Sequence, residues 1–285
     1  MSRIAKSAKS ILGTFLENGF AVIPEFIGRS QAAALVSESE RILDKYFVES
    51  EQQKLVSNAE KLGDHSITHK DEVTMTFHPN SFDKNGRLLV SKHRALHSIG
   101  MKLHNLFEPF KKATFSEDVK HVLQRLQYGN PIVFESSVVY KAPGAKELAM
   151  HQDESYYRTD PPGSGLAFWI ALDDATEDNG CLQIYPGSHK AAFLPRVILE
   201  VDNKLKIIEE NNTYKNIEES KFVKLPVEMG SLILVDGFLL HKSGPNDTDN
   251  LRRAYMFHLF DKSKSNWMKN NYVKQGDVYS FNSVY

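Results

Sequence analysis

Residues 230–244 read GSLILVDGFLLHKSG, an apolar run that Gly237 interrupts and that carries His241 close to its end. Short β-branched and aromatic runs bounded by Gly, Pro, Asn and Asp are typical of the strands of antiparallel sandwiches and barrels. The same texture recurs in NPIVFESSVVYKAP (130–143), GLAFWIALDDA (165–175), GCLQIYPGSH (180–189) and RRAYMFHLF (252–260). The second half of the chain therefore predicts an antiparallel β core.

The first part of the chain has a helical texture, because its apolar residues recur at helical spacing. A short buried strand is expected at FAVIPEFI (20–27), and Ser30 is the expected N-cap of the helix that follows it. A polar loop is expected over 59–72. The expected helices span about residues 5–18, 30–56, 92–107 and 116–126.

No Gly/Ser-rich linker separates the helical part from the β part. The sequence therefore predicts a mainly β fold with flanking helices, in a single domain over 1–285. Its helix-rich part covers about 1–126, and its β core covers about 127–262. A charged, Asn-rich stretch at 190–225 reads as a long excursion between strands, either a lid or a surface decoration.

Composition and charge narrow the range of partners. The 285 residues carry a formal net charge of −1, which gives no electrostatic basis for nucleic acid as the main partner. Cys181 is the sole cysteine of the sequence, so no intramolecular disulfide or cysteine-based zinc site can form. Since no apolar run reaches about 18 residues, we expect no membrane span. The single cysteine and the lack of a clear peroxisomal or secretory signal lead us to expect a cytoplasmic location. The basic N-terminal segment is interpreted as an amphipathic helix, with a mitochondrial transit peptide as the alternative.

A histidine and an aspartate lie one residue apart in MHQD (150–153). On an extended backbone, residues i and i+2 point to the same side, so His151 and Asp153 can reach one ion. His241 is the best third ligand, because it ends a strand-like segment and a rigid element holds a ligand well. Two imidazoles and a carboxylate suit a non-haem Fe(II) that binds a cosubstrate and oxygen, although the set does not exclude zinc.

An arginine follows this group at the start of RRAYMFHLF (252–260). A strand can send Arg252 inward while Arg253 points to the other face. A buried arginine needs an anion, and without a nearby acid a bound dicarboxylate is the natural partner. Ser243 can add a hydroxyl to the same carboxylate.

Other polar residues have more ordinary interpretations. The histidines expected on a helix, at its surface or in helix packing, are His93, His97 and His104. His258 is expected at a core or rim position. Lys141 and Lys146 are expected in the solvated surface unless they meet a substrate phosphate.

These segments together resemble the phytanoyl-CoA dioxygenase family of Fe(II)/2-oxoglutarate-dependent oxygenases. The motifs that carry the resemblance are MHQD (150–153), WIALDDATEDNGCLQIYPGSHK (169–190), LLHKSGPN (239–246) and RRAYMFHLF (252–260). The resemblance implies a double-stranded β-helix core, the cupin-like jelly roll. It also implies Fe(II), 2-oxoglutarate and O₂ as cofactors, with ascorbate as the reductant.

The resemblance also implies roles for individual residues. The implied iron ligands are His151, Asp153 and His241. Arg252 and Ser243 match the positions that grip the distal carboxylate of 2-oxoglutarate. Trp169 matches an aromatic residue of the cosubstrate pocket, and Lys92 matches a lysine near its entrance. Ser137 falls where relatives can carry a larger pocket residue.

The leading hypothesis is a dioxygenase that hydroxylates a small, lipid-like or acyl-type organic substrate and releases succinate and CO₂. Related halogenating oxygenases replace the acidic ligand by a small residue, so Asp153 argues for hydroxylation. One alternative is a non-catalytic jelly roll that binds metal and 2-oxoglutarate in a sensing or interaction role. Another is a cupin-like zinc hydrolase with the same ligands, which leaves Arg252 and Ser243 unexplained.

Overall fold

A computed structural model of the chain describes residues 4–48, 66–69, 73–78, 81–83, 85, 87–190, 195–199, 205–208, 217–271 and 281–285. Its helices are α1 (Ile4–Asn18), α2 (Arg29–Tyr46), α4 (Lys92–Ala95), α5 (Leu103–Leu106), α6 (Glu108–Thr114) and α7 (Glu117–Arg125). The first strands are β1 (Phe20–Ile23), β2 (Ser66–His69), β3 (Val73–Phe77), β4 (Leu96–Met101), β5 (Pro131–Lys141), β6 (Leu148–His151), β7 (Thr159–Asp160) and β8 (Gly165–Ala171). The later strands are β9 (Leu182–Ile184), β10 (Arg196–Leu199), β11 (Leu205–Ile208), β12 (Val223–Leu225), β13 (Leu232–Asp236), β14 (His241–Ser243), β15 (Arg252–Asp261), β16 (Asn266–Trp267) and β17 (Asn282–Ser283).

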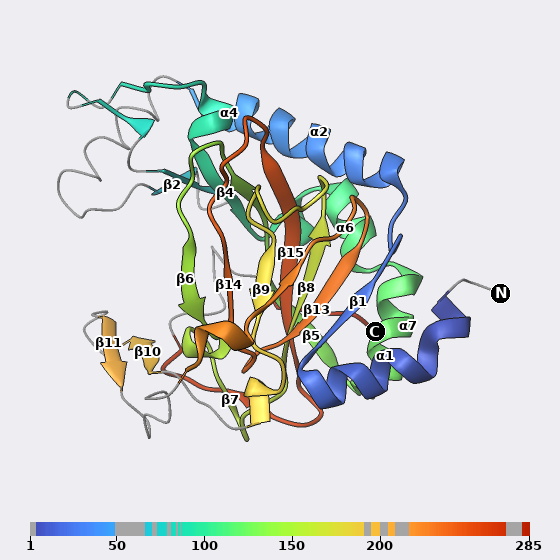
Figure 1. Ribbon diagram of the computed structural model, residues 1–285. Helices are drawn as coiled ribbons and strands as arrows, with labels where there is room; N and C mark the ends of the chain where they lie inside the picture. The colour runs from blue at the N-terminus through green and yellow to red at the C-terminus, as the bar shows by residue number, and fades with distance from the viewer. Residues whose placement is uncertain are drawn as a thin grey trace.

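A large antiparallel sheet has the strand order β1-β13-β8-β15-β5-β4-β3-β2, and β17 also pairs with β5. A smaller sheet, β12-β9-β14-β6, lies against one face of it (Figure 1). The space between the sheets is filled by side chains of both, such as Trp169 and Val235 from the large sheet and Ile184 from the small one. These facing antiparallel sheets confirm the predicted mainly β, jelly-roll fold.

Helices cover the outer face of the large sheet (Figure 1). Alternate residues of β15, Tyr255 and Phe257 among them, point to this side and share a core with residues of α2, α6 and α7. The contact also has polar anchors. The hydroxyls of Thr114 in α6 and Tyr255 lie 2.6 Å apart, and those of Ser39 in α2 and Tyr140 lie 2.7 Å apart. The flanking helices thus leave the inner face of the sheet for the site.

The predicted helix over 92–107 is wrong, because β4 separates the short helices α4 and α5. Strand β4 pairs with β3 on one side and with β5 on the other, and these ladders outweigh its helical apolar spacing. The helix-rich N-terminal part consequently adds strands β1 to β4 to the sheet. This pairing also takes His97 out of the predicted helix and places it on a strand.

The structure contains the three other predicted helices, although their ends differ in places. Helix α1 covers the segment predicted at 5–18, and α7, with Ser116 as its N-cap, covers the one at 116–126. Helix α2 follows Gly28 as its N-cap, so the prediction of Ser30 as N-cap is wrong; Gly28 N–H donates to the Gln31 side chain at 2.9 Å. The helix predicted over 30–56 ends at Tyr46, and 49–56 lies outside the described residues.

Two predicted irregular segments contain strands. Strand β2 lies inside the loop predicted at 59–72, most of which is outside the described residues. The excursion predicted at 190–225 contains the antiparallel pair β10 and β11, and β12 of the small sheet. Across the part of the chain that the structure describes, no helix is both long and apolar enough to cross a membrane.

The register of β15 fixes which side chains share the inner face. Across β5, Arg252 pairs with Lys141 and Met256 pairs with Ser137. Across β8, Met256 pairs with Trp169. Side chains alternate along a strand, so every second residue from Arg252 to Met256 faces the small sheet. A slip of one residue would turn all of them to the helical side.

Gly230, before β13, has a φ of +92° and sits where an added Cβ would collide with the backbone oxygen of Ile27. We expect Gly230→Ala to lower the free energy of unfolding by about 1–3 kcal/mol. The matched control is Gly13→Ala, at an exposed position of helix α1, where an added Cβ meets nothing within 4 Å. Gly13→Ala should raise the free energy of unfolding by up to about 1 kcal/mol. Thermal unfolding of both variants measures the difference, and equal melting temperatures would contradict the backbone account.

Candidate metal centre and adjoining cavity

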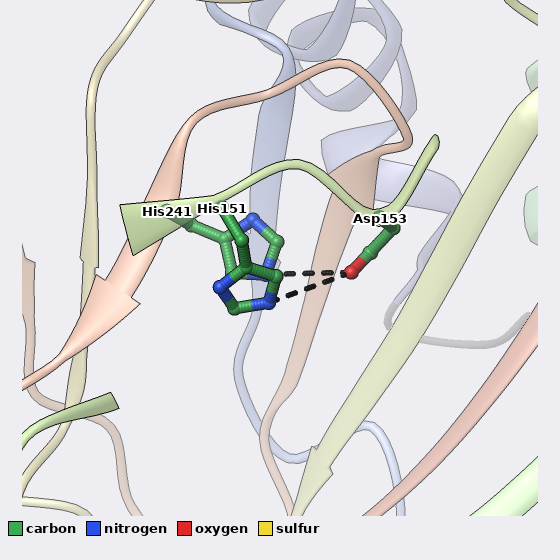
Figure 2. A group of neighbouring side chains, drawn as sticks. All are labelled: His151, Asp153 and His241. Carbon is green, nitrogen blue, oxygen red and sulfur yellow. Dashed lines mark ion pairs between the residues drawn. The ribbon is translucent and has the colours of Figure 1, made fainter. Parts of the chain in front are cut away.

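Three side chains from two distant parts of the chain, His151 and Asp153 from one and His241 from the other, point toward one another (Figure 2). His151 ends β6, His241 begins β14, and these residues are directly paired across the two strands. The centroids of their rings lie 4.2 Å apart. Asp153, two residues after His151, begins a 3₁₀ turn. Asp153 Oδ1 is 3.8 Å from His151 Nε2 and 3.6 Å from His241 Nε2. The potential ligand atoms of all three residues lie within 4.8 Å of one another, so they could hold a metal ion.

The residues beside Asp153 attach it to the segment that leads to His241. Gln152, fully buried, donates its side-chain amide to the Phe238 carbonyl, and Glu154 N–H donates to the Gly237 carbonyl at 2.9 Å. A Cβ at Gly237 would lie 2.7 Å from Glu154 Cγ. This close approach explains why glycine interrupts the apolar run of 230–244.

Backbone carbonyls orient both imidazoles. His151 Nδ1 lies 2.9 Å from the Ala149 oxygen, and His241 Nδ1 lies 3.0 Å from the Leu239 oxygen. If each Nδ1–H donates to its carbonyl, each Nε2 keeps a lone pair toward Asp153. Metal-bound histidines are commonly fixed in this way through their second nitrogen.

The protonation states also suit a metal. Burial, followed by the proximity of His241, lowers the pKa of His151 to about 4. Burial raises the pKa of the Asp153 carboxyl, but the nearby His241 and His258 lower it by more. The pKa therefore lies well below its usual value. A neutral His151 and an ionised Asp153 are the forms that bind a cation.

A cavity of about 320 Å³ adjoins the two histidines. The residues that line it between the metal group and β15 are Val139, Lys141, Trp169, Leu182, Ser243, Arg252 and Met256. Trp169, Ser243 and Arg252 thus line one cavity, and β14 carries Ser243 on the same side as His241. The cavity joins the metal group to polar side chains of the large sheet.

Two buried cations share this cavity. Arg252 is 3% exposed; its Nη2 donates to the Gly180 carbonyl at 2.9 Å, and its guanidinium lies 5.4 Å from the centre of the Trp169 ring. Among the described residues, its Nε has no hydrogen-bond partner. Lys141, paired with it across the strands, is 6% exposed and donates to Ser243 Oγ at 2.9 Å. Within the described part of the chain, no carboxylate forms an ion pair with either cation.

Burial lowers the pKa of Arg252 to about 10 and the pKa of Lys141 to about 8, the latter with a further contribution from Arg252. Like charges directly opposite each other on paired strands destabilise a sheet. Buried charges without a counter-ion carry a large desolvation cost. The pair therefore makes this end of the cavity a site for an anion.

Two other predicted residues do not line this cavity. Lys92, at the start of α4, has its Nζ 2.6 Å from Asp44 Oδ1 of α2. Ser137 is buried on the inner side of β5, opposite Gly100 of β4 and Met256 of β15. Neither is among the cavity-lining residues.

Sequence reasoning missed two residues of the cavity. Lys141 was expected in the solvated surface, and this interpretation is wrong because the end of β5 turns it inward. His97 was expected on a helix and instead lines the cavity from β4. Alternation along β5 was the available signal for Lys141. His258, expected at a core or rim position, is buried beside Asp153.

A family model described as phytanoyl-CoA dioxygenase (PhyH) matches residues 15–254. The chain belongs to the phytanoyl-CoA dioxygenase family. It is 29% identical over 284 residues to phytanoyl-CoA dioxygenase domain-containing protein 1 of Danio rerio, covering 95% of this chain and 96% of that protein. The Bos taurus protein of the same name is 31% identical over 284 residues, covering 97% and 98%. The family match and the His–Asp–His group confirm the predicted cofactors, Fe(II) and 2-oxoglutarate.

Solved structures share the fold at low identity. The epimerase SnoN from nogalamycin biosynthesis, in complex with Fe³⁺, alpha ketoglutarate and nogalamycin RO, has a TM-score of 0.64 at 13% identity, over 97% of this chain and 99% of that chain. EvdO2 from Micromonospora carbonacea var. aurantiaca, complexed with 2-oxoglutarate, has a TM-score of 0.55 at 19% identity, over 92% and 93%. This likeness supports the jelly-roll fold of the phytanoyl-CoA dioxygenase family.

The cation pair has a measurable effect on stability. Because the folded-state pKa of Lys141, about 8, is below its unfolded value, the unfolded chain binds more protons between about pH 8 and 10.5, and folding gains stability as the pH rises there. We expect Lys141→Met, of similar volume, to stabilise the ligand-free protein by about 1–3 kcal/mol at pH 7. That corresponds to about 2–4 °C in melting temperature per kcal/mol.

The gain from Lys141→Met should shrink as the pH rises from 8 to 10, because the wild-type lysine is then neutral in the folded state. Thermal unfolding of the wild type and the variant across this pH range tests the claim. Lys146→Met, at an exposed position, is the control and should change little. A gain that stays constant with pH would contradict a buried Lys141 cation.

Proposed function

We propose that the protein is a dioxygenase that uses Fe(II) and 2-oxoglutarate to hydroxylate a small, lipid-like or acyl-type organic substrate, releasing succinate and CO₂. The observation that carries this proposal is the buried pair Arg252 and Lys141 in the cavity that adjoins the metal group. A keto acid with two carboxylates can reach from the metal group to these cations, with one end at each. O₂ is the co-reactant, and ascorbate is the expected reductant.

In this proposal, His151, Asp153 and His241 would hold Fe(II), since His151 Nε2, His241 Nε2 and Asp153 Oδ1 face one another. When bound, Fe(II) would supply the redox chemistry that couples decarboxylation of the keto acid to oxidation of the substrate. Two histidines and one carboxylate leave positions for other ligands on the ion. The protein's own task is to hold this arrangement.

Arg252 and Lys141 would bind the distal carboxylate of 2-oxoglutarate. The Gly180 carbonyl and the Trp169 ring fix the plane of the Arg252 guanidinium, so its remaining N–H groups are preorganised for a carboxylate. Ser243 Oγ already accepts a hydrogen bond from Lys141, which leaves its own hydroxyl hydrogen for the same anion. A carboxylate between the two cations would also offset part of the desolvation cost that they carry.

Apolar side chains separate the charged parts of the cavity. Leu182, Met256 and Val139 lie in its wall, together with Trp169. Such a wall excludes water from the bound keto acid and strengthens its contacts with the cations. We assign Trp169 to the cosubstrate pocket on this basis. Lys92 and Ser137 receive no such assignment, because neither lines the cavity.

We also propose that residues 1–285 act as one domain. The pairing of β1 with β13 and of β4 with β5 supports this, since it makes the N-terminal strands part of the sheet that carries the site. A substrate of small-molecule type is consistent with the size of the cavity, about 320 Å³. Nucleic acid is not expected as a partner, given the net charge of −1.

Arg252→Ala tests the assigned anion site. We expect the KM for 2-oxoglutarate to rise about 10- to 100-fold, because a hydrogen-bonded charge contact is worth about 1.5–3 kcal/mol. Succinate formation, followed by NMR with Fe(II), ascorbate and O₂, is the measurement. Turnover with a metabolite panel separates an enzyme from a non-catalytic 2-oxoglutarate-binding protein, which would form no succinate under any condition.

The matched control is Arg253→Gln, at the next residue, whose side chain points to the other face and pairs with Asp173 and Glu40 at 2.8 Å. This variant should lose stability while the KM for 2-oxoglutarate stays near the wild-type value. An unchanged KM in Arg252→Ala, or an equal change in both variants, would contradict the assignment of Arg252 to the cosubstrate.

A further inference from the structure

The inner face of β15 carries a second charged group, away from the cation pair. His258 is 5% exposed and lies between two carboxylates. Its Nε2 is 3.4 Å from Asp153 Oδ2, and its Nδ1 is 3.7 Å from Glu135 Oε2. Both contacts are ion-pair distances, and neither nitrogen forms a hydrogen bond with any of the described residues. His258 and Glu135 do not line the cavity, so the proposed cosubstrate site leaves both unexplained.

Strand register and aromatic packing place the His258 ring. His258 pairs with Glu135 on β5 and with Ala167 on β8, and the register with β5 shifts between His258 and Leu259. Phe134 stacks on the ring at 6.0 Å between centroids, and Tyr157 meets it edge-on at 6.1 Å. Because these neighbours are buried, the ring cannot turn away from Asp153 without disturbing the aromatic cluster.

The two oxygens of Asp153 consequently have different surroundings. Oδ1 faces His151 and His241, at 3.8 and 3.6 Å from their Nε2 atoms. Oδ2 faces His258 Nε2 at 3.4 Å. An oxygen that faces an imidazole nitrogen on one side is a poor second ligand for an ion on the other side. The geometry therefore favours a carboxylate that gives a single oxygen to the metal.

We propose that His258, supported by Glu135, is a positioning residue that keeps Asp153 a one-oxygen metal ligand. This inference rests on the proposed function for its purpose. A keto acid fills two positions of an octahedral ion whose protein ligands fill three, so one position remains for O₂. A carboxylate bound through both oxygens would fill that last position. Partners of this kind around a metal site orient its ligands and tune the metal.

The test counts waters on Mn(II) bound to the full-length protein without 2-oxoglutarate, by pulsed EPR in ¹⁷O-labelled water. The wild type should hold about three waters, one for each position that the protein leaves open. His258→Phe keeps a ring against Phe134 and Tyr157 but removes both nitrogens, so Asp153 can bind through both oxygens. We expect it to hold about two waters. His258→Gln retains an N–H donor and should restore the wild-type number.

A buried histidine elsewhere serves as the control. His104 is fully buried, with its Nδ1 2.6 Å from Ser136 Oγ, and is remote in sequence from the metal ligands. His104→Leu should lower the melting temperature without changing the water count. If His258→Phe does not fold, His258→Leu replaces it with the same expected loss of one water.

The outcomes separate this inference from the proposed function. About three waters on His258→Phe or His258→Leu would overturn the positioning role and leave the metal site intact. A wild type that binds Mn(II) with about three waters but forms no succinate would overturn the dioxygenase, while loss of a water in His258→Phe would still support the positioning role. A wild type that does not bind Mn(II) would overturn both.

Discussion

The pairing of β15 with β5 is the constraint on which the rest of the site depends. It sets Arg252 opposite Lys141 and His258 opposite Glu135, with Met256 opposite Ser137 between them. Both charged pairs lie on the inner face, and the outer face of the same strands holds Tyr255 and Phe257 against the helices. Since side chains alternate along a strand, one register specifies the apolar core, the cation pair and the place of His258 on the inner face together.

Placing the two cations side by side lowers the stability of the fold and favours the binding of an anion. Two cations face each other at one end of the sheet, and burial lowers the pKa of both. A sequence optimised only for folding would not place them there, because local violations of folding rules collect at functional sites. Among the nearby carboxylates, Asp173 binds Arg253 on the opposite face, and Asp153 faces the histidines. Glu147 lines the cavity but, among the described residues, forms no ion pair with either cation. The cation pair is thus left for a ligand from solution.

The sequence could predict the metal group and the strand that begins with Arg252, because both use local signals. His151 and Asp153 are spaced for one face of an extended segment, and His241 ends an apolar run. Arg252 opens a strand. For Lys141 the alternation of side chains along 130–143 was an available signal, whereas the place of His258 beside Asp153 follows from which strands lie next to it. The helix predicted over 92–107 failed for the same reason, since the pairing of β4 with β3 and β5 is not written in its own apolar spacing.

The central claim is that Fe(II) at His151, Asp153 and His241 and a keto acid at Arg252 and Lys141 share one cavity. An anaerobic optical titration tests it most directly: Fe(II) is added first, then 2-oxoglutarate. The account predicts a visible metal-to-ligand charge-transfer band that needs both components and is absent in Asp153→Ala. No band in the wild type, or the same band in Asp153→Ala, would contradict it.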